Sequence, residues 1–266
     1  WNKSTRRQFD VGSICSCFCH CPSFYVSYVF PKTSNKWINN WSRQRLMKIK
    51  AVLFGSIGTI VETSNIQRQS FNKAFKKNGL DWYWTKKMYK SMLQKPGGEI
   101  RVKKFGISKK TIVNAKQIRN LKTFIFNQYL KKNKLKPRAG VKNIIKFCKK
   151  NKLRIGFVTS TTKNNVDGVF QSLKHHIKKN DFDYIGHDKI IKTFKDKSDI
   201  YKHCLKKLNL RSNKCVAVED TEISLSYARR AKIKCIAFPG EFHLTGKYKD
   251  SLIKVRRLNP KIFSDL

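Results

Sequence analysis

Several groups that can take part in chemistry follow or precede short apolar runs of this 266-residue sequence. They are hydroxyls, an amine and paired carboxylates, and they come just after predicted strands or at the start of a predicted helix. In a doubly wound sheet, ligands bind at the carboxyl ends of the strands, so these positions are the candidates for a functional site. In chain order they are the turn Gly55–Thr59, Thr159 and Ser160, Lys195, and Glu219 and Asp220.

The elements that must position these groups alternate between strand and helix. The run 49–54 is short and largely apolar, which is typical of a buried parallel strand. Apolar residues at helical spacing predict a helix over 64–77 that stops at Asn78-Gly79. After Pro137, the pattern predicts helices 141–150, 164–173, 198–208 and 223–231 and strands 154–158, 182–185, 214–218 and 234–238. This alternation predicts an α/β fold with a doubly wound parallel sheet.

The order of the polar groups resembles that of the haloacid dehalogenase (HAD) phosphatases over roughly residues 48–245. A hydroxyl after one strand, a lysine before a helix and paired acids after another strand match the later three of the family's four motifs. The resemblance implies a Rossmann-like core formed by 47–63 and 137–266, with an inserted helical cap over 64–136. The cap is similar to that of CbbY-type sugar bisphosphate phosphatases, on the strings Gln69–Asn72, Gly79–Trp84, Tyr89, Gly97-Gly98 and Arg101.

The first motif departs from the family's pattern. Where the family has Asp-x-Asp-Gly-Thr, this sequence has Gly55-Ser56-Ile57-Gly58-Thr59. The family's reaction requires a carboxylate that attacks phosphorus and a second carboxylate that protonates the leaving oxygen. Neither Gly55 nor Ile57 can do this, so we expect no catalytic residue and a pseudoenzyme.

The same departure bears on the family's Mg²⁺ ion, which binds oxygen ligands that include the first aspartate. Only Glu219 and Asp220 remain as carboxylates, and two acids are a poor cage for an ion that needs near-octahedral coordination. We therefore expect no cofactor, and Mg²⁺ only if some activity persists. A vestigial phosphate site is a separate possibility: Thr159 and Ser160 would donate to phosphate oxygens and Lys195 would neutralise them. Alternatively, Lys195 pairs with Glu219 or Asp220 and has only a structural role.

The cap has also drifted from the family's pattern. Gln67, just before Arg68, stands where the family has a histidine. Glu99, just after Gly97-Gly98, stands where the family has a lysine. Two tryptophans, Trp82 and Trp84, could stack on nucleic-acid bases, but the family context favours a place in the core of the cap.

The charge of the chain is extreme, because 59 Lys and Arg against 16 Asp and Glu give a formal charge of +43. Such self-repulsion indicates a polyanionic partner: nucleic acid, an anionic membrane face or an acidic protein. The basic residues are spread along the chain rather than gathered in one amphipathic helix, which favours RNA over a membrane surface. The alternative is that lysine is simply abundant and solvated.

The first 46 residues are basic, with a single acid, Asp10, and predict either an organellar targeting segment or an extension that threads into RNA. The run Cys15–Cys21 has alternating cysteines, which lack the spacer of a zinc knuckle. No stretch reaches the roughly 18 apolar residues that a membrane span requires. The other cysteines stand singly beside apolar neighbours, as core residues of a reducing compartment do: Cys148, Cys204, Cys215 and Cys235.

These features together predict a catalytically inactive HAD-like protein that is a structural, RNA-associated component of an organellar ribonucleoprotein. The mitochondrial ribosome is the first candidate, with ribosomal RNA and neighbouring ribosomal proteins as partners, and the mitochondrion is preferred to the plastid. One alternative is a Mg²⁺-dependent sugar-phosphate phosphatase of the HAD family with residual or altered activity. Another is a scaffold that binds an acidic protein.

Overall fold

The structure, a computed structural model, describes residues 49–93, 97–190 and 196–266. All of them belong to one compact unit that extends to Leu266. The predictions for the basic segment 1–46, the run Cys15–Cys21 and Lys195 lie outside the described residues.

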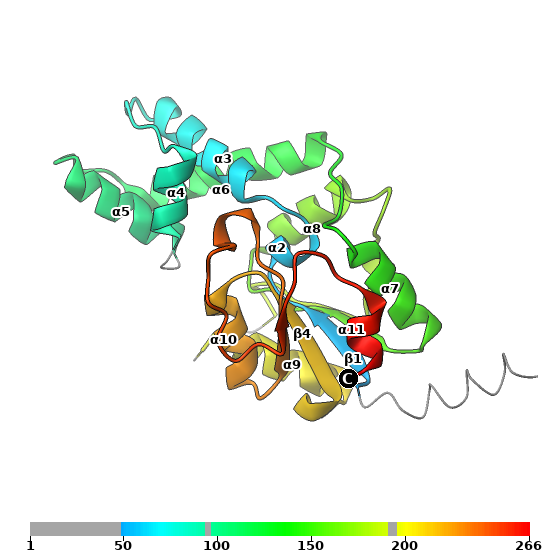
Figure 1. Ribbon diagram of the computed structural model, residues 1–266. Helices are drawn as coiled ribbons and strands as arrows, with labels where there is room; N and C mark the ends of the chain where they lie inside the picture. The colour runs from blue at the N-terminus through cyan, green and yellow to red at the C-terminus, as the bar shows by residue number, and fades with distance from the viewer. Residues whose placement is uncertain (1–48, 94–96, 191–195) are drawn as a thin grey trace, which may run out of the picture. The chain divides into compact units, whose positions relative to one another are not determined.

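A six-stranded parallel sheet forms the centre of the described part (Figure 1). Its order changes direction between two central strands, which creates the switch point where α/β proteins place their ligands. The register aligns Phe54 with Phe157 on one side and with Val218 on the other, so two of the strands end at the same level and the third ends one residue beyond it. From edge to edge the strands are β3 (Tyr184–Ile185), β2 (Arg154–Phe157), β1 (Ala51–Phe54), β4 (Cys215–Glu219), β5 (Lys234–Ala237) and β6 (Ile253–Lys254).

Helices cover both faces of the sheet, because successive residues of the buried strands point to opposite sides. Val52 and Phe54 of β1 pack in one apolar cluster, and Ala51 and Leu53 pack in the other. The first cluster is closed by α7 (Val141–Lys150), α8 (Lys163–Ser172) and α11 (Pro260–Ser264), and the second by α9 (Asp199–Leu208) and α10 (Glu222–Arg230). The expected α/β doubly wound fold is therefore confirmed.

Four helices between β1 and α7 pack around a third apolar cluster. Trp84 is fully buried there, with ring centroids 4.8 Å from Phe71 and 4.7 Å from Phe75, and Trp82 is also buried. The tryptophans thus belong to the core of the helical insert, as the sequence predicted, while the insert's boundaries at 64 and 136 stay predictions. The helices are α3 (Ser64–Lys77), α4 (Lys86–Met92), α5 (Gly98–Ser108) and α6 (Ala115–Lys132).

The predicted helices 64–77 and 141–150 are confirmed to the residue, and the other predicted elements differ mainly at their ends. The strand predicted over 182–185 is only Tyr184–Ile185; a 3₁₀ helix, η1 (Lys179–Asp181), precedes it, and Phe182 and Asp183 connect the two. The strand predicted over 214–218 begins one residue later, after η2 (Ser212–Lys214), and includes Glu219. The main chain of Glu219 is therefore held in the sheet, where its carbonyl accepts from Phe238 N at 2.7 Å.

The sequence did not predict β6, α11 or the short helices α2 (Ile57–Ile60) and η3 (Glu241–His243). Strand β6 consists of two exposed residues at the sheet edge, Ile253 and Lys254, and is too short to show a periodic pattern. The four single cysteines are buried free thiols, which confirms their place in the core. Among the described residues, no helix combines the length and apolar character needed to cross a membrane.

Candidate functional site

The centre of the candidate site is the contact between Gly55 and Glu219 at the ends of β1 and β4. The amide of Gly55 continues the ladder by donating to Val218 O at 3.0 Å. A Cβ atom built on Gly55 would overlap the carboxyl group of Glu219, far inside van der Waals contact. The Glu219 carboxyl group therefore occupies the space that a longer side chain at position 55 would need.

Glu219 is buried, and the polar partners of its carboxyl group are the side chains of Tyr201 and Ser224 and the amide of Ser56. The hydroxyl of Tyr201 donates to one oxygen, and the amide of Ser56 lies 3.5 Å from the other. Burial, and secondly the charge of Asp220, raise the pKa of Glu219 to about 8. The carboxyl group is thus mainly neutral at neutral pH, which suits a structural acid in an apolar surrounding.

Asp220 is held in a similar way by the first turn. The hydroxyl of Ser56 donates to its carboxylate, and a Cβ atom on Gly58 would overlap the same carboxylate. Burial raises the pKa of Asp220, while the hydrogen bond from Ser56 and the nearby His243 and Arg138 act in the opposite direction. The turn after β1 therefore makes room for both acids, while Ile57 itself is buried against the apolar core.

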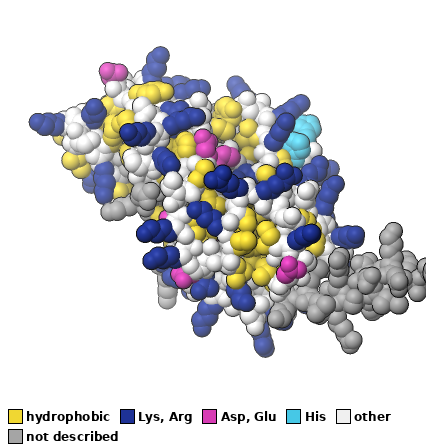
Figure 2. Space-filling view, viewed as in Figure 1, with side chains coloured by type: hydrophobic (Ala, Val, Ile, Leu, Met, Phe, Trp, Pro, Cys, Tyr) yellow, Lys and Arg dark blue, Asp and Glu magenta, His cyan; other side chains and the backbone are white. Residues whose placement is uncertain are grey.

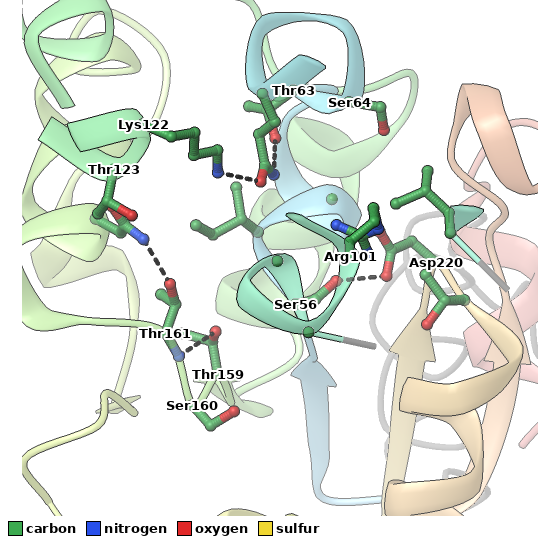
Figure 3. Close-up of a pocket in the computed structure, with 18 of the residues that line it drawn as sticks. Ser56, Thr63, Ser64, Arg101, Lys122, Thr123, Thr159, Ser160, Thr161 and Asp220 are labelled. Carbon is green, nitrogen blue, oxygen red and sulfur yellow. Dashed lines mark hydrogen bonds between the residues drawn. The ribbon is translucent and has the colours of Figure 1, made fainter. Parts of the chain in front are cut away.

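The end of β2 contributes a row of hydroxyl groups. The amide of Thr161 donates to Thr159 Oγ1 at 3.2 Å, which fixes the loop before α8. Thr162 caps that helix by accepting from the amide of Asn165 at 3.3 Å. Thr159, Ser160 and Thr161 line the same cavity as Ser56 and Asp220, so the structure brings together the predicted hydroxyls and one of the predicted acids (Figure 3).

Arg138 connects the loop after β1 with the loop after β5, and no pattern in the sequence indicated it. Its guanidinium donates to Gly58 O at 2.7 Å, Phe238 O at 2.8 Å and Pro239 O at 2.5 Å. It also lies 3.5 Å from the centroid of the Phe238 ring. These contacts hold the first turn against the segment after β5, and all three hydrogen bonds are to main-chain oxygens.

The cavity itself has a volume of about 460 Å³ and lies between the strand ends and the helical insert. Two basic residues of the helical insert, Lys122 of α6 and Arg101 of α5, line the cavity together with Ser56 and Asp220 (Figure 3). Among the described residues that line it, Asp220 is the only acid, whereas the cations are Arg101, Arg119, Lys122 and Lys197. Its electrostatic character is that of an anion-binding cavity, and phosphate esters are anions of fitting size.

Lys122 is the most unusual of these cations because it is buried. Its Nζ donates to Gln67 Oε1 at 2.9 Å and lies about 5 Å from the ring centroids of Phe71 and Phe126. Burial, and secondly the charges of Arg101 and Arg119, lower the pKa of Lys122 to about 7. The charge of this cavity wall therefore changes near neutral pH.

Gln67 and Glu99, the two residues of the cap that differ from the family's pattern, have structural roles at the cavity wall. Gln67 accepts from Lys122 and donates to Thr63 Oγ1 at 3.3 Å. Glu99 forms an ion pair with Arg119 at 3.7 Å and so offsets one cation of the cavity. Arg68, by contrast, is buried and donates to Trp84 O at 2.7 Å, which assigns it to the interior of the insert.

The described residues do not fit the family's Mg²⁺ ion. They contain no group of three or more His, Cys, Asp or Glu side chains that could hold a metal. The acid pair has one member, Glu219, that is engaged by Tyr201 and fills the space at Gly55. Lys195 lies outside the described residues, so its pairing with an acid and its contact with phosphate stay predictions.

A doubly wound parallel sheet, a helical insert after the first strand and a polar cavity at the strand ends define an α/β protein of the HAD type. Residues 52–238 match the family described as haloacid dehalogenase-like hydrolase. The chain belongs to this family, and the resemblance found in the sequence is confirmed at this level.

Several relatives that match the chain are CbbY proteins. The chain is 30% identical to Protein CbbY of Rhodobacter capsulatus over 199 residues, which cover 74% of this chain and 88% of the relative. It is 29% identical to Protein CbbY of Cereibacter sphaeroides over 195 residues, covering 72% and 85%. The crystal structure of CbbY from Rhodobacter sphaeroides in complex with phosphate is 26% identical, with a TM-score of 0.69, over 82% of this chain and 96% of that chain.

Proposed function

We propose that this chain is a non-hydrolysing member of the HAD family, whose role is to bind and not to cleave. The observation that carries the proposal is the Glu219 carboxyl group, which fills the place of a nucleophilic side chain at position 55. With Gly55 and Ile57 in the first motif, no carboxylate is available there to form a phosphoenzyme. Losing a nucleophile and its acid together removes most of the rate enhancement of such a reaction.

The binding role that we propose is that of a structural, RNA-associated component of an organellar ribonucleoprotein, with the mitochondrial ribosome as first candidate. It is supported by the formal charge of +43. Lysines and arginines are spread over the described face in Figure 2, and acids occupy only a few places on it. Contacts from such residues to phosphates supply sequence-independent affinity for RNA.

A second candidate is Mg²⁺-dependent hydrolysis of a sugar phosphate, and the comparisons favour it because several relatives and the similar crystal structure are CbbY proteins. The retained cavity, with Thr159, Lys122 and Arg101 in its wall, also favours it. One solved CbbY structure holds xylulose-(1,5)bisphosphate, which makes this compound a suitable probe.

Two assays on the full chain separate the candidates. In the first, phosphate release from xylulose-(1,5)bisphosphate is measured with and without Mg²⁺, for the wild type and for Lys122→Met. We expect every sample to release phosphate no faster than buffer without protein. Mg²⁺-dependent release that Lys122→Met abolishes would establish the second candidate instead.

In the second assay, the native protein is sedimented from organelle extracts before and after ribonuclease treatment. We expect it to migrate with ribosomal particles and to leave that fraction after the treatment. Sedimentation as a free protein in both samples, or no RNA binding at low salt, contradicts the RNA-associated role.

A further inference from the structure

A second hollow of the molecule lies between α3 and α6, apart from the cavity at the strand ends. It has a volume of about 470 Å³, and every described residue that lines it belongs to these two helices or follows α6 directly. We call it the α3/α6 groove. Its lining residues are Ile66, Gln69, Ser70, Lys73, Lys76, Lys77, Phe124, Ile125, Gln128, Tyr129, Lys132 and Asn133.

The charge of the two helices is of one sign only. Their sequences contain no Asp or Glu, and they carry nine basic residues: Arg68, Lys73, Lys76, Lys77, Lys116, Arg119, Lys122, Lys131 and Lys132. Lysines in a last helical turn are favoured by the helix dipole, which accounts for those near the ends. It does not account for the complete lack of acids on two helices that pack against each other. The rim of the groove therefore repels cations and attracts a polyanion.

The floor of the groove offers aromatic and aliphatic surface. Phe124 is 58% exposed, although a phenylalanine is usually buried, and Tyr129 and Ile125 are half-buried beside it. Lys73, Lys76, Lys77 and Lys132 surround this floor, and all four are exposed. Flat apolar rings beside exposed amines are the combination with which proteins bind single-stranded nucleic acid: bases stack on the rings, and phosphates contact the amines.

We infer that the α3/α6 groove binds a single-stranded segment of RNA, with a base stacked on Phe124 and its neighbouring phosphates held by the lysines of the rim. This inference rests on the proposed RNA association and assigns a place to it. An acidic protein segment would satisfy the lysines as well. The exposed ring of Phe124 favours RNA, because RNA alternates flat bases with phosphates along one strand.

The test measures binding of a fluorescent oligouridine to the full chain by anisotropy at low salt. Phe124→Ala removes the stacking surface, and the double variant Lys73→Glu/Lys77→Glu reverses two charges of the rim. The matched controls are Tyr83→Ala, which removes an aromatic that is 65% exposed outside the groove, and Lys206→Glu/Lys207→Glu on α9, which makes the same change of charge at exposed positions. Thermal unfolding of each variant verifies that it is folded.

We expect Phe124→Ala to weaken binding by about five-fold or more, which corresponds to the loss of one stacked base. The rim variant should weaken it further, and each control should have a clearly smaller effect than its partner. Equal losses in groove and control variants would overturn the inference, because binding would then be diffuse. If the groove variants lost the binding of an acidic protein while their affinity for RNA stayed unchanged, the inference would also be overturned. A wild-type chain that binds no oligouridine would overturn both this inference and the proposed RNA association.

Discussion

The carboxyl group of Glu219 lies where the side chain of residue 55 would project, so the two positions cannot both carry a large group without rearrangement. Gly55 belongs to the turn after β1 and Glu219 ends the neighbouring strand, and the parallel register sets them side by side. The hydrogen bond from Tyr201 holds the carboxyl group there. Several measurable properties follow from this relationship and from the charges around it.

Introducing a carboxylate at position 55 should destabilise the protein. Gly55→Asp should lower the free energy of unfolding by about 1–3 kcal/mol through overpacking, and further through repulsion from Asp220. Gly55→Asn, which has the same size and no charge, should show only the first loss. Denaturant unfolding measures both, and Mg²⁺ should stabilise the Asp variant while leaving the wild type unchanged. Equal stability of the wild type and Gly55→Asp would show that Glu219 moves aside freely.

Glu219 should make the stability depend on pH in a defined direction. Its pKa is raised in the folded state from an ordinary value of 4.5 to about 8, so the folded chain binds more protons between these values than the unfolded chain. The free energy of unfolding should therefore fall as the pH rises from 4.5 to about 8, by an amount on the order of a few kcal/mol. Urea unfolding at several pH values measures this slope, and Glu219→Gln should flatten it. A slope that the substitution leaves unchanged would assign the pH dependence to other groups.

Lys122 should make anion binding in the strand-end cavity depend on pH. Its pKa is lowered to about 7, so its amine gains a charge as the pH falls through neutrality. Sulfate keeps its own charge over this range and is a suitable probe. Calorimetry should detect tighter sulfate binding at about pH 6 than at about pH 8.

The variant Lys122→Met should weaken sulfate binding roughly ten-fold at the lower pH and remove the pH dependence. The control Lys206→Met removes an exposed lysine outside the cavity and should change neither quantity. Sulfate affinity that is the same for all three proteins would exclude Lys122 from the anion site.

Arg138 should contribute more to stability than an exposed arginine. Arg138→Met leaves three carbonyl oxygens at the strand ends without their donor and should lower the free energy of unfolding by about 3 kcal/mol or more. Arg154→Met breaks an exposed ion pair with Asp183 and should change it by at most about 1 kcal/mol. Chemical denaturation of the two variants side by side makes the comparison, and similar losses would contradict the clamping role of Arg138.

The sequence predicted most of the fold because periodic apolar patterns determine which faces become buried. Helices 64–77 and 141–150 have clear patterns, and the structure forms them over these residues. Strand β6 has two exposed residues and no such pattern. Short elements of this kind are stabilised by neighbours that are distant in the sequence, so a local pattern cannot indicate them.

Within the candidate site, the sequence indicated the loops but not the contacts. Thr159, Ser160 and Asp220 do line one cavity, as residues at the ends of parallel strands should. The lowered pKa of Lys122 depends on burial and on Arg101 and Arg119, which the packing of two helices brings together. No spacing within the chain could predict that environment.

The packing of α3 against α6 affects how much of the protein persists in the cell. Nine basic residues and no acid belong to these two helices, so repulsion among the charged ones opposes folding whenever the chain is free. A polyanion that binds only the folded chain would stabilise it by mass action. Copies without such a partner would then unfold and be degraded first, and the amount of the protein would follow the amount of the partner it joins.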